Sequence, residues 1–118
     1  MYFAGCEGGN LDVIKILNRN PEFVNTQQNG ETGLIKALTA ASKQSTDRLH
    51  DYKAVIEAHM GIEGIMRSTL SEALNKAKQI YTNKCAQDKT KEGMVRARWY
   101  SEISKMLQNS IDKRKLKG

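Results

Sequence analysis

The sequence predicts an all-α protein, with short paired helices in its first half and a longer antiparallel pair of helices in its second half. Two observations lead to this prediction. The chain of 118 residues holds a single Pro, so little in it interrupts a helix. Apolar residues also recur three and four positions apart in several segments, which is the spacing that forms one face of a helix. The length fits a single domain over residues 1–118, with a first part over 1–61 and a second part over 62–118.

The first clear helical pattern lies between residues 10 and 20. Asn10 can cap its start, and Asp12 places a negative charge in its first turn. Pro21 ends it, because Pro disfavours a helical residue before it. The stretch 25–30 that follows ends in Asn29-Gly30, a pair that favours a tight turn. The apolar positions of this helix are Leu11, Val13, Ile14, Ile16 and Leu17.

Three segments together resemble the ankyrin repeat family over about residues 2–60. The segment 6–17, CEGGNLDVIKIL, resembles the second half of a repeat, with its Gly-Asn turn and paired aliphatic residues. The segment 23–25, FVN, resembles the Val-Asn that leads into the family's hairpin loop. The segment 30–37, GETGLIKA, resembles the Gly-x-Thr-Pro-Leu-His-x-Ala opening of the next repeat.

The sequence departs from the family pattern in three ways. Gly33 and Ile35 stand where the family prefers Pro and His, and the aliphatic pair Val55-Ile56 arrives about ten residues late. We therefore expect a polar extension over 43–51 and a second helix over 51–60. The first repeat is also incomplete, since Tyr2 falls where its opening helix should already have begun. Either an N-terminal portion has been removed or the stack is capped in an unfamiliar way.

Two longer apolar stripes follow, and we expect them to form an antiparallel helix pair that acts as a C-terminal cap. Two repeats cannot bury both of their ends, so another element must complete the stack. The polar stretch 83–93 would connect the two helices, each roughly 30 Å long. A coiled-coil partner surface is the alternative. The first stripe is Ile62, Ile65, Met66, Leu70, Ala73, Leu74, Ala77 and Tyr81, and the second is Val95, Trp99, Ile103, Met106, Leu107 and Ile111.

The resemblance implies a non-catalytic scaffold that binds another protein. In the ankyrin family the hairpin tips and the first helix of each repeat form the concave binding surface. Carried over to matching positions, this implies partner contacts from Gln28, Asn29, Glu31, Lys36 and Thr39, and Lys43 is added because it lies next to them. The residues expected in the core are Val13, Ile14, Leu17, Leu34, Ala37, Val55 and Ile56.

The positive charge of the chain lies in its second part and suggests an alternative partner. Residues 1–61 hold 6 Lys/Arg against 7 Asp/Glu, whereas residues 62–118 hold 13 against 6. A basic surface of this kind can attract nucleic acid or an anionic membrane. We expect Trp99 in the core and Tyr100 on or near the surface. The candidate basic residues are Lys91, Arg96, Arg98, Lys105, Lys113, Arg114 and Lys115, of which Lys91, Arg98 and Lys105 recur every seven positions.

No catalytic, cofactor or metal site is expected from the residues. Cys6 and Cys85 are far apart and lack metal-ligand spacing, so we expect free thiols. His50 and His59 have no nucleophile in a recognisable context. The glycines near residues 5–9 lack the Gly-Lys-Ser/Thr of a phosphate loop. No small-molecule substrate is expected, and the lack of a secretory signal or a long apolar run predicts a cytoplasmic protein.

Overall fold

The computed structural model describes residues 2–85 and 87–117, with side chains up to residue 114. Most of this part of the chain is helical, which confirms the predicted all-α class. The first half contains α1 (Tyr2–Gly8), α2 (Asp12–Arg19), a 3-10 turn (Pro21–Asn25), the strands β1 (Gln27–Gln28) and β2 (Glu31–Thr32), α3 (Gly33–Ala41), a second 3-10 turn (Thr46–Arg48) and α4 (Leu49–Met60). The second half contains α5 (Arg67–Ile80), a π-helical turn (Tyr81–Cys85) and α6 (Lys91–Lys117).

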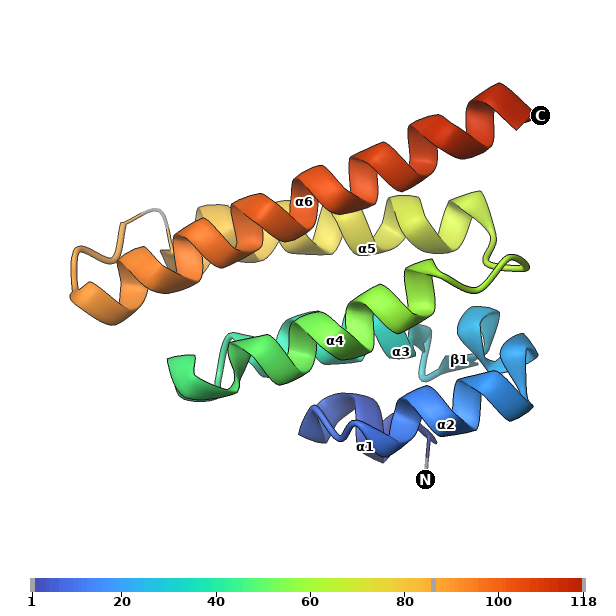
Figure 1. The fold of residues 1–118 in the computed structure, drawn as a ribbon. Coiled ribbons are helices and arrows are strands. Elements are labelled where there is room, and N and C mark those ends of the chain that lie inside the picture. The colour runs from blue at the N-terminus through green and yellow to red at the C-terminus, as the bar shows by residue number, and fades with distance from the viewer. Residues whose placement is uncertain (1, 86, 118) are drawn as a thin grey trace.

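The helices form three successive pairs arranged in two layers (Figure 1). In one layer α1 packs on α3, and α3 packs on α5. In the other layer α2 packs on α4, and α4 packs on α6. Within the pairs, α1 contacts α2, α3 contacts α4, and α5 contacts α6. The α5–α6 pair therefore covers the side of the α3–α4 pair that α1 and α2 leave open.

The residues before α3 that the sequence suggested as helix and turn signals are Asn10, Pro21 and the Asn29-Gly30 pair. The Asn10 side-chain oxygen accepts a hydrogen bond from the Asp12 backbone N–H at 2.9 Å, and Pro21 begins the first 3-10 turn. β1 and β2 pair antiparallel. Asn29 and Gly30 between them both have positive φ, at 56° and 80°, as a two-residue hairpin requires.

Most of the predicted core is confirmed, but α2 is less buried than expected. Val13 and Leu17 are buried, Ile14 is only half-buried, and Leu11 is 49% exposed. A short surface helix in a two-layer stack buries a narrow stripe, and Leu11 lies outside it. The other expected core residues are all buried, namely Leu34, Ala37, Val55 and Ile56.

α3 is buried at most of its positions because α1, α4 and α5 all pack against it. Its first residue, Gly33, lies against the Tyr2 hydroxyl and the Cys6 sulfur of α1. A Cβ atom at Gly33 would overlap both groups. This close approach is the physical reason that Gly, and not the bulkier Pro of the ankyrin pattern, fits here.

The second half departs from the expected helix lengths. α5 has 14 residues and α6 has 27, which correspond to about 21 Å and about 40 Å instead of two helices of similar length. Trp99 is buried as expected, but Tyr100 is completely buried and not at the surface. Three residues of the predicted stripes are exposed instead of buried, namely Met66, Tyr81 and Val95.

Long polar side chains attach each helix pair to the one before it. Arg48 and Tyr52 of the α4 region donate hydrogen bonds to the carbonyls of Gly8 and Glu7 at the end of α1, both at 2.6 Å. Asn25 links the first pair to α5. Its side-chain oxygen accepts from the Met66 backbone N–H at 2.8 Å and from the Thr69 hydroxyl at 2.9 Å, so it satisfies an N–H at the start of α5.

Candidate functional site

Two shallow hollows lie on either side of α3, on the layer formed by α1, α3 and α5. The first, of about 420 Å³, lies between the end of α1 and α3. The second, of about 570 Å³, lies between the hairpin, α3 and α5. Glu31 lines both of them. We call the surface that carries the two hollows and the hairpin tip the hairpin face.

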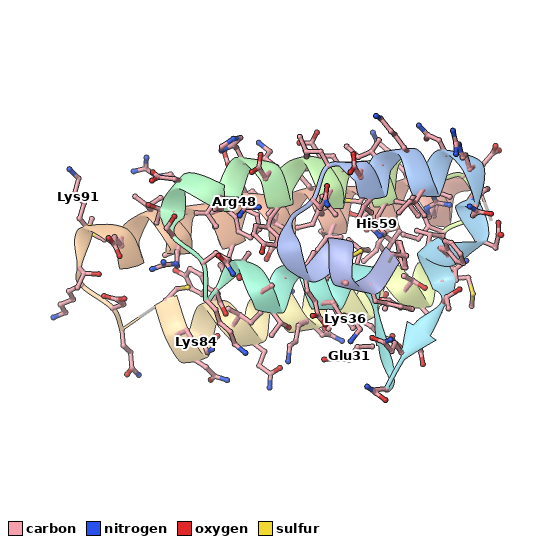
Figure 2. The ribbon with its side chains drawn as sticks, turned by 90° about the horizontal axis from the view of Figure 1, so that it is seen from below. Glu31, Lys36, Arg48, His59, Lys84 and Lys91 are labelled. Carbon is pink, nitrogen blue, oxygen red and sulfur yellow. The ribbon has the colours of Figure 1, made fainter. Side chains whose placement is uncertain are left out.

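The six residues predicted to contact a partner gather on the hairpin face. Glu31, Lys36, Thr39 and Lys43 line the first hollow. Gln28 and Asn29 are exposed at the hairpin tip. The structure thus brings residues from β1, the turn, β2 and α3 to one side of the molecule, and Figure 2 shows Glu31 and Lys36 close together there.

Lys36 occupies a position that the sequence did not predict. Its side chain is only 7% exposed, so it does not extend into solvent as a free contact. Its Nζ atom lies 3.5 Å from a Glu7 oxygen and 3.9 Å from a Glu31 oxygen, and 5.7 Å from the centre of the Phe3 ring. The two carboxylates are about half exposed, at 55% and 43%. Lys36 therefore holds Glu7 and Glu31 at the rim of the first hollow.

Thr39 also differs from a simple surface contact. Its hydroxyl oxygen is buried and has no hydrogen-bond partner among the described residues. The Thr39 side chain lines the first hollow, and the exposed Lys43 lines the same hollow.

Several residues of the hairpin face were missed by the sequence reasoning. Glu7 and Gln44 complete the first hollow, and α5 contributes the far wall of the second. The α5 residues recur three and four positions apart, opposite the apolar stripe, and that polar periodicity was a usable signal. They are Glu72, Asn75, Lys76 and Gln79.

Some of the predicted basic side chains are exposed, and others donate hydrogen bonds to backbone carbonyls of the protein. Lys91, Arg98, Lys105 and Lys113 are exposed. Arg96 instead donates to the Gln44 carbonyl at 2.6 Å. Arg114 donates to the carbonyls of Glu63 and Ile62 at 3.0 and 3.1 Å. These two arginines donate to backbone oxygens of the protein itself, so their positions are fixed by the fold while their charge still contributes to the predicted basic surface. The Lys115 side chain lies outside the described residues.

A buried polar cluster joins α1 to α4. His59 Nδ1 lies 2.7 Å from the Val55 carbonyl and must donate to it, so the neutral ring accepts at Nε2 from the Tyr2 hydroxyl at 2.6 Å. Cys6 Sγ lies 3.8 Å from the same Nε2. Burial raises the pKa of the Cys6 thiol to about 12 and lowers the pKa of His59. A cysteine acts as a nucleophile only as a thiolate. Burial keeps the Cys6 thiol protonated, which favours a structural role for this cluster.

Cys6 and Cys85 are both free, as predicted. Within residues 2–85 and 87–117, no three His, Cys, Asp or Glu side chains come together as metal ligands would. None of the described helices combines the length and the apolar character needed to cross a bilayer.

In comparisons with family models, curated proteins and solved structures, nothing matches this chain. The geometry of the hairpin face and the residues that line it are therefore the basis for inferring a function.

Proposed function

We propose that this chain is a non-catalytic scaffold of the ankyrin-repeat type, which binds another protein through the hairpin face. The observation that carries the proposal is the convergence of two hollows on α3, with the exposed hairpin tip beside them. Hollows lined by polar side chains from separate elements suit the side chains of a protein partner, because shape and charge can both be matched there.

The arrangement of the helices supports the proposal of an ankyrin-type scaffold. A helix pair, a hairpin and a second helix pair follow one another, in the order expected of ankyrin repeats. The α5–α6 pair then acts as the C-terminal cap. The residues that line its groove each carry a polar group, as suits a terminal element of a stack, and they are Lys78, Tyr81, Thr82, Ser101 and Ser104.

Site-specific photocrosslinking in cells that make the protein tests this proposal. A benzophenone side chain in place of exposed Gln28 or Lys43 should crosslink to a partner protein. The same group at His50, which is 80% exposed on α4 in the other layer, is the matched control. Equal crosslinking at all three positions would contradict a binding surface on the hairpin face.

Charge reversal then tests the recovered partner. Lys43→Glu should weaken its binding about tenfold, because a like charge at an interface repels the partner group that Lys43 attracts. Glu57→Lys reverses an exposed charge on α4 and should leave the affinity unchanged. A partner that binds the Lys43→Glu variant with unaltered affinity would exclude Lys43 from the interface.

A further inference from the structure

The first two turns of α6 expose an apolar pair between two cations. Lys91, Met94, Val95 and Arg98 are spaced three, four and seven residues apart, so they share one side of the helix. Met94 is 64% exposed and Val95 is 45% exposed. Lys91 and Arg98 are exposed on either side of them along the helix. We call these four residues the elbow patch, because they follow the turn between α5 and α6.

The elbow patch lies in a basic part of the chain. Residues 78–98 hold six Lys/Arg against two Asp/Glu. The carboxylate of Asp88 accepts hydrogen bonds from the Thr90 backbone N–H and hydroxyl, at 2.9 and 2.6 Å. The other acid, Glu92, lies 4.0 Å from Arg96. Figure 2 shows Lys84 and Lys91 toward one end of the molecule, away from Glu31 and Lys36.

We infer that the elbow patch docks this protein onto the surface of an anionic lipid bilayer. Cations beside a bilayer gain free energy from its anionic headgroups. Exposed Met and Val side chains gain more by entering the boundary between headgroups and acyl chains. Phosphate contacts to nucleic acid would use Lys91 and Arg98 but would give no role to an exposed Met94-Val95 pair. The combination of charge and apolar surface therefore favours a membrane.

This surface is independent of the hairpin face. α6 belongs to the layer of α2 and α4, whereas both hollows lie on the layer of α1, α3 and α5 (Figure 1). The elbow patch shares no residue with either hollow.

Cosedimentation of the full chain with lipid vesicles tests the inference. The protein should bind vesicles of phosphatidylcholine mixed with phosphatidylserine, and should not bind phosphatidylcholine alone. Lys91→Ala and Arg98→Ala should each lower the partition coefficient about fivefold. The double variant Met94→Ser/Val95→Ser should lower it about tenfold or more. Lys15→Ala changes an exposed residue of α2 and Leu11→Ser changes the exposed residue just before it, and neither should have an effect.

A fluorescent readout gives a second measurement that does not depend on sedimentation. An environment-sensitive dye on Met94→Cys should shift to the blue when anionic vesicles are added, and the same dye on Leu11→Cys should not. Failure to bind the mixed vesicles would overturn the inference. So would binding that the Met94→Ser/Val95→Ser variant leaves unchanged. If a short DNA duplex binds instead, with steep salt dependence and no loss in that variant, the patch is a nucleic-acid surface.

Discussion

The interface between the first and second helix pairs and the interface between the second and third are held by the same kind of hydrogen bonds, but their buried cores differ. At the first interface Arg48 and Tyr52 donate to carbonyls at the end of α1. At the second, Arg96 donates to the Gln44 carbonyl just after α3, and Tyr100 donates to the Leu38 carbonyl within α3. In both cases an Arg is followed four residues later by a Tyr. This spacing places both side chains on one side of a helix, from which they reach the C-terminal end of the preceding pair's first helix.

The cores of the two interfaces contain different chemistry. The first buries the cluster of Tyr2, Cys6 and His59. The second buries mainly apolar residues of α5 and α6, with the Tyr100 hydroxyl bound inside it. The same Arg and Tyr hydrogen bonds therefore occur at one interface whose core contains a titratable imidazole and at another whose core depends on apolar packing. The first should respond to acid, and the second should be more sensitive to loss of packing.

Removing the second interface should have the largest effect. Deletion of 62–118 takes away α5 and α6 and exposes the sides of α3 and α4 that they cover. We expect the 1–61 fragment to be unfolded or aggregated, as measured by circular dichroism and size-exclusion chromatography. Deletion of 115–118 alone leaves Arg114 and its hydrogen bonds in place and should leave folding almost unchanged. A 1–61 fragment that melts cooperatively as a monomer would show that the first interface suffices.

Loss of a buried side chain at the first interface should have the next largest effect. Leu17 is completely buried and Leu11 is 49% exposed, although both belong to one apolar pattern. Leu17→Ala should lower the free energy of unfolding by about 2 to 5 kcal/mol, whereas Leu11→Ala should change it by less than about 0.5 kcal/mol. Urea denaturation measures both. Similar values for the two variants would mean that α2 is packed differently.

Replacing Tyr100 or Tyr52 by Phe removes only the hydroxyl, so the two variants compare how much each hydroxyl contributes to stability. Tyr100→Phe leaves the Leu38 carbonyl without its partner inside the second interface and should cost about 1 to 3 kcal/mol of stability. Tyr52 is also completely buried, but its hydroxyl donates to the carbonyl of the exposed Glu7, which water can reach in place of the hydroxyl, so Tyr52→Phe should cost about 1 kcal/mol or less. Thermal and urea unfolding of both variants provide the measurement. The reverse order would contradict the burial assigned to the second interface.

Acid should weaken the first interface through His59. Burial lowers the pKa of this ring, so the folded protein binds fewer protons there than the unfolded chain. Stability should therefore be complete above about pH 6.5 and fall as the pH drops below that value. The slope should reach at most about 1.4 kcal/mol per pH unit. His59→Gln should lose this dependence and His50→Gln should retain it, and unfolding measured across this pH range distinguishes them.

Sequence patterns predicted the features that depend on neighbouring residues. The turn at Asn29-Gly30 follows from two residues that tolerate positive φ, and Asn10 accepts a hydrogen bond from the Asp12 N–H although it lies one residue before the Leu11 cap position of α2. Leu17 and Ile103 are buried because helical periodicity places them on apolar faces. The resemblance to ankyrin repeats led to the prediction that Gln28, Asn29 and Glu31 contact a partner, with Lys43 added because it lies next to the matched positions, and this stays a prediction.

Other features required the positions of residues far apart in the chain. Tyr100 is buried beside Trp99 because α6 packs against both α4 and α5, so its buried face is wider than one apolar stripe. Arg96 and Arg114 look like free cations in the sequence, but they bind carbonyl oxygens, and carbonyl acceptors have no signature in an amino-acid sequence.

The sequence by itself determined the helical class, the hairpin turn and most of the core, because these depend on local propensity and on the period of the apolar residues. Only the tertiary structure decided which charged residues are free. Lys36 is buried because Phe3 and Glu7 of α1 and Glu31 of β2 surround it, whereas Met94 and Val95 are exposed because none of the described elements covers that side of α6. Burial of a side chain is a property of the elements packed around it, and a single chain's local pattern does not contain their positions.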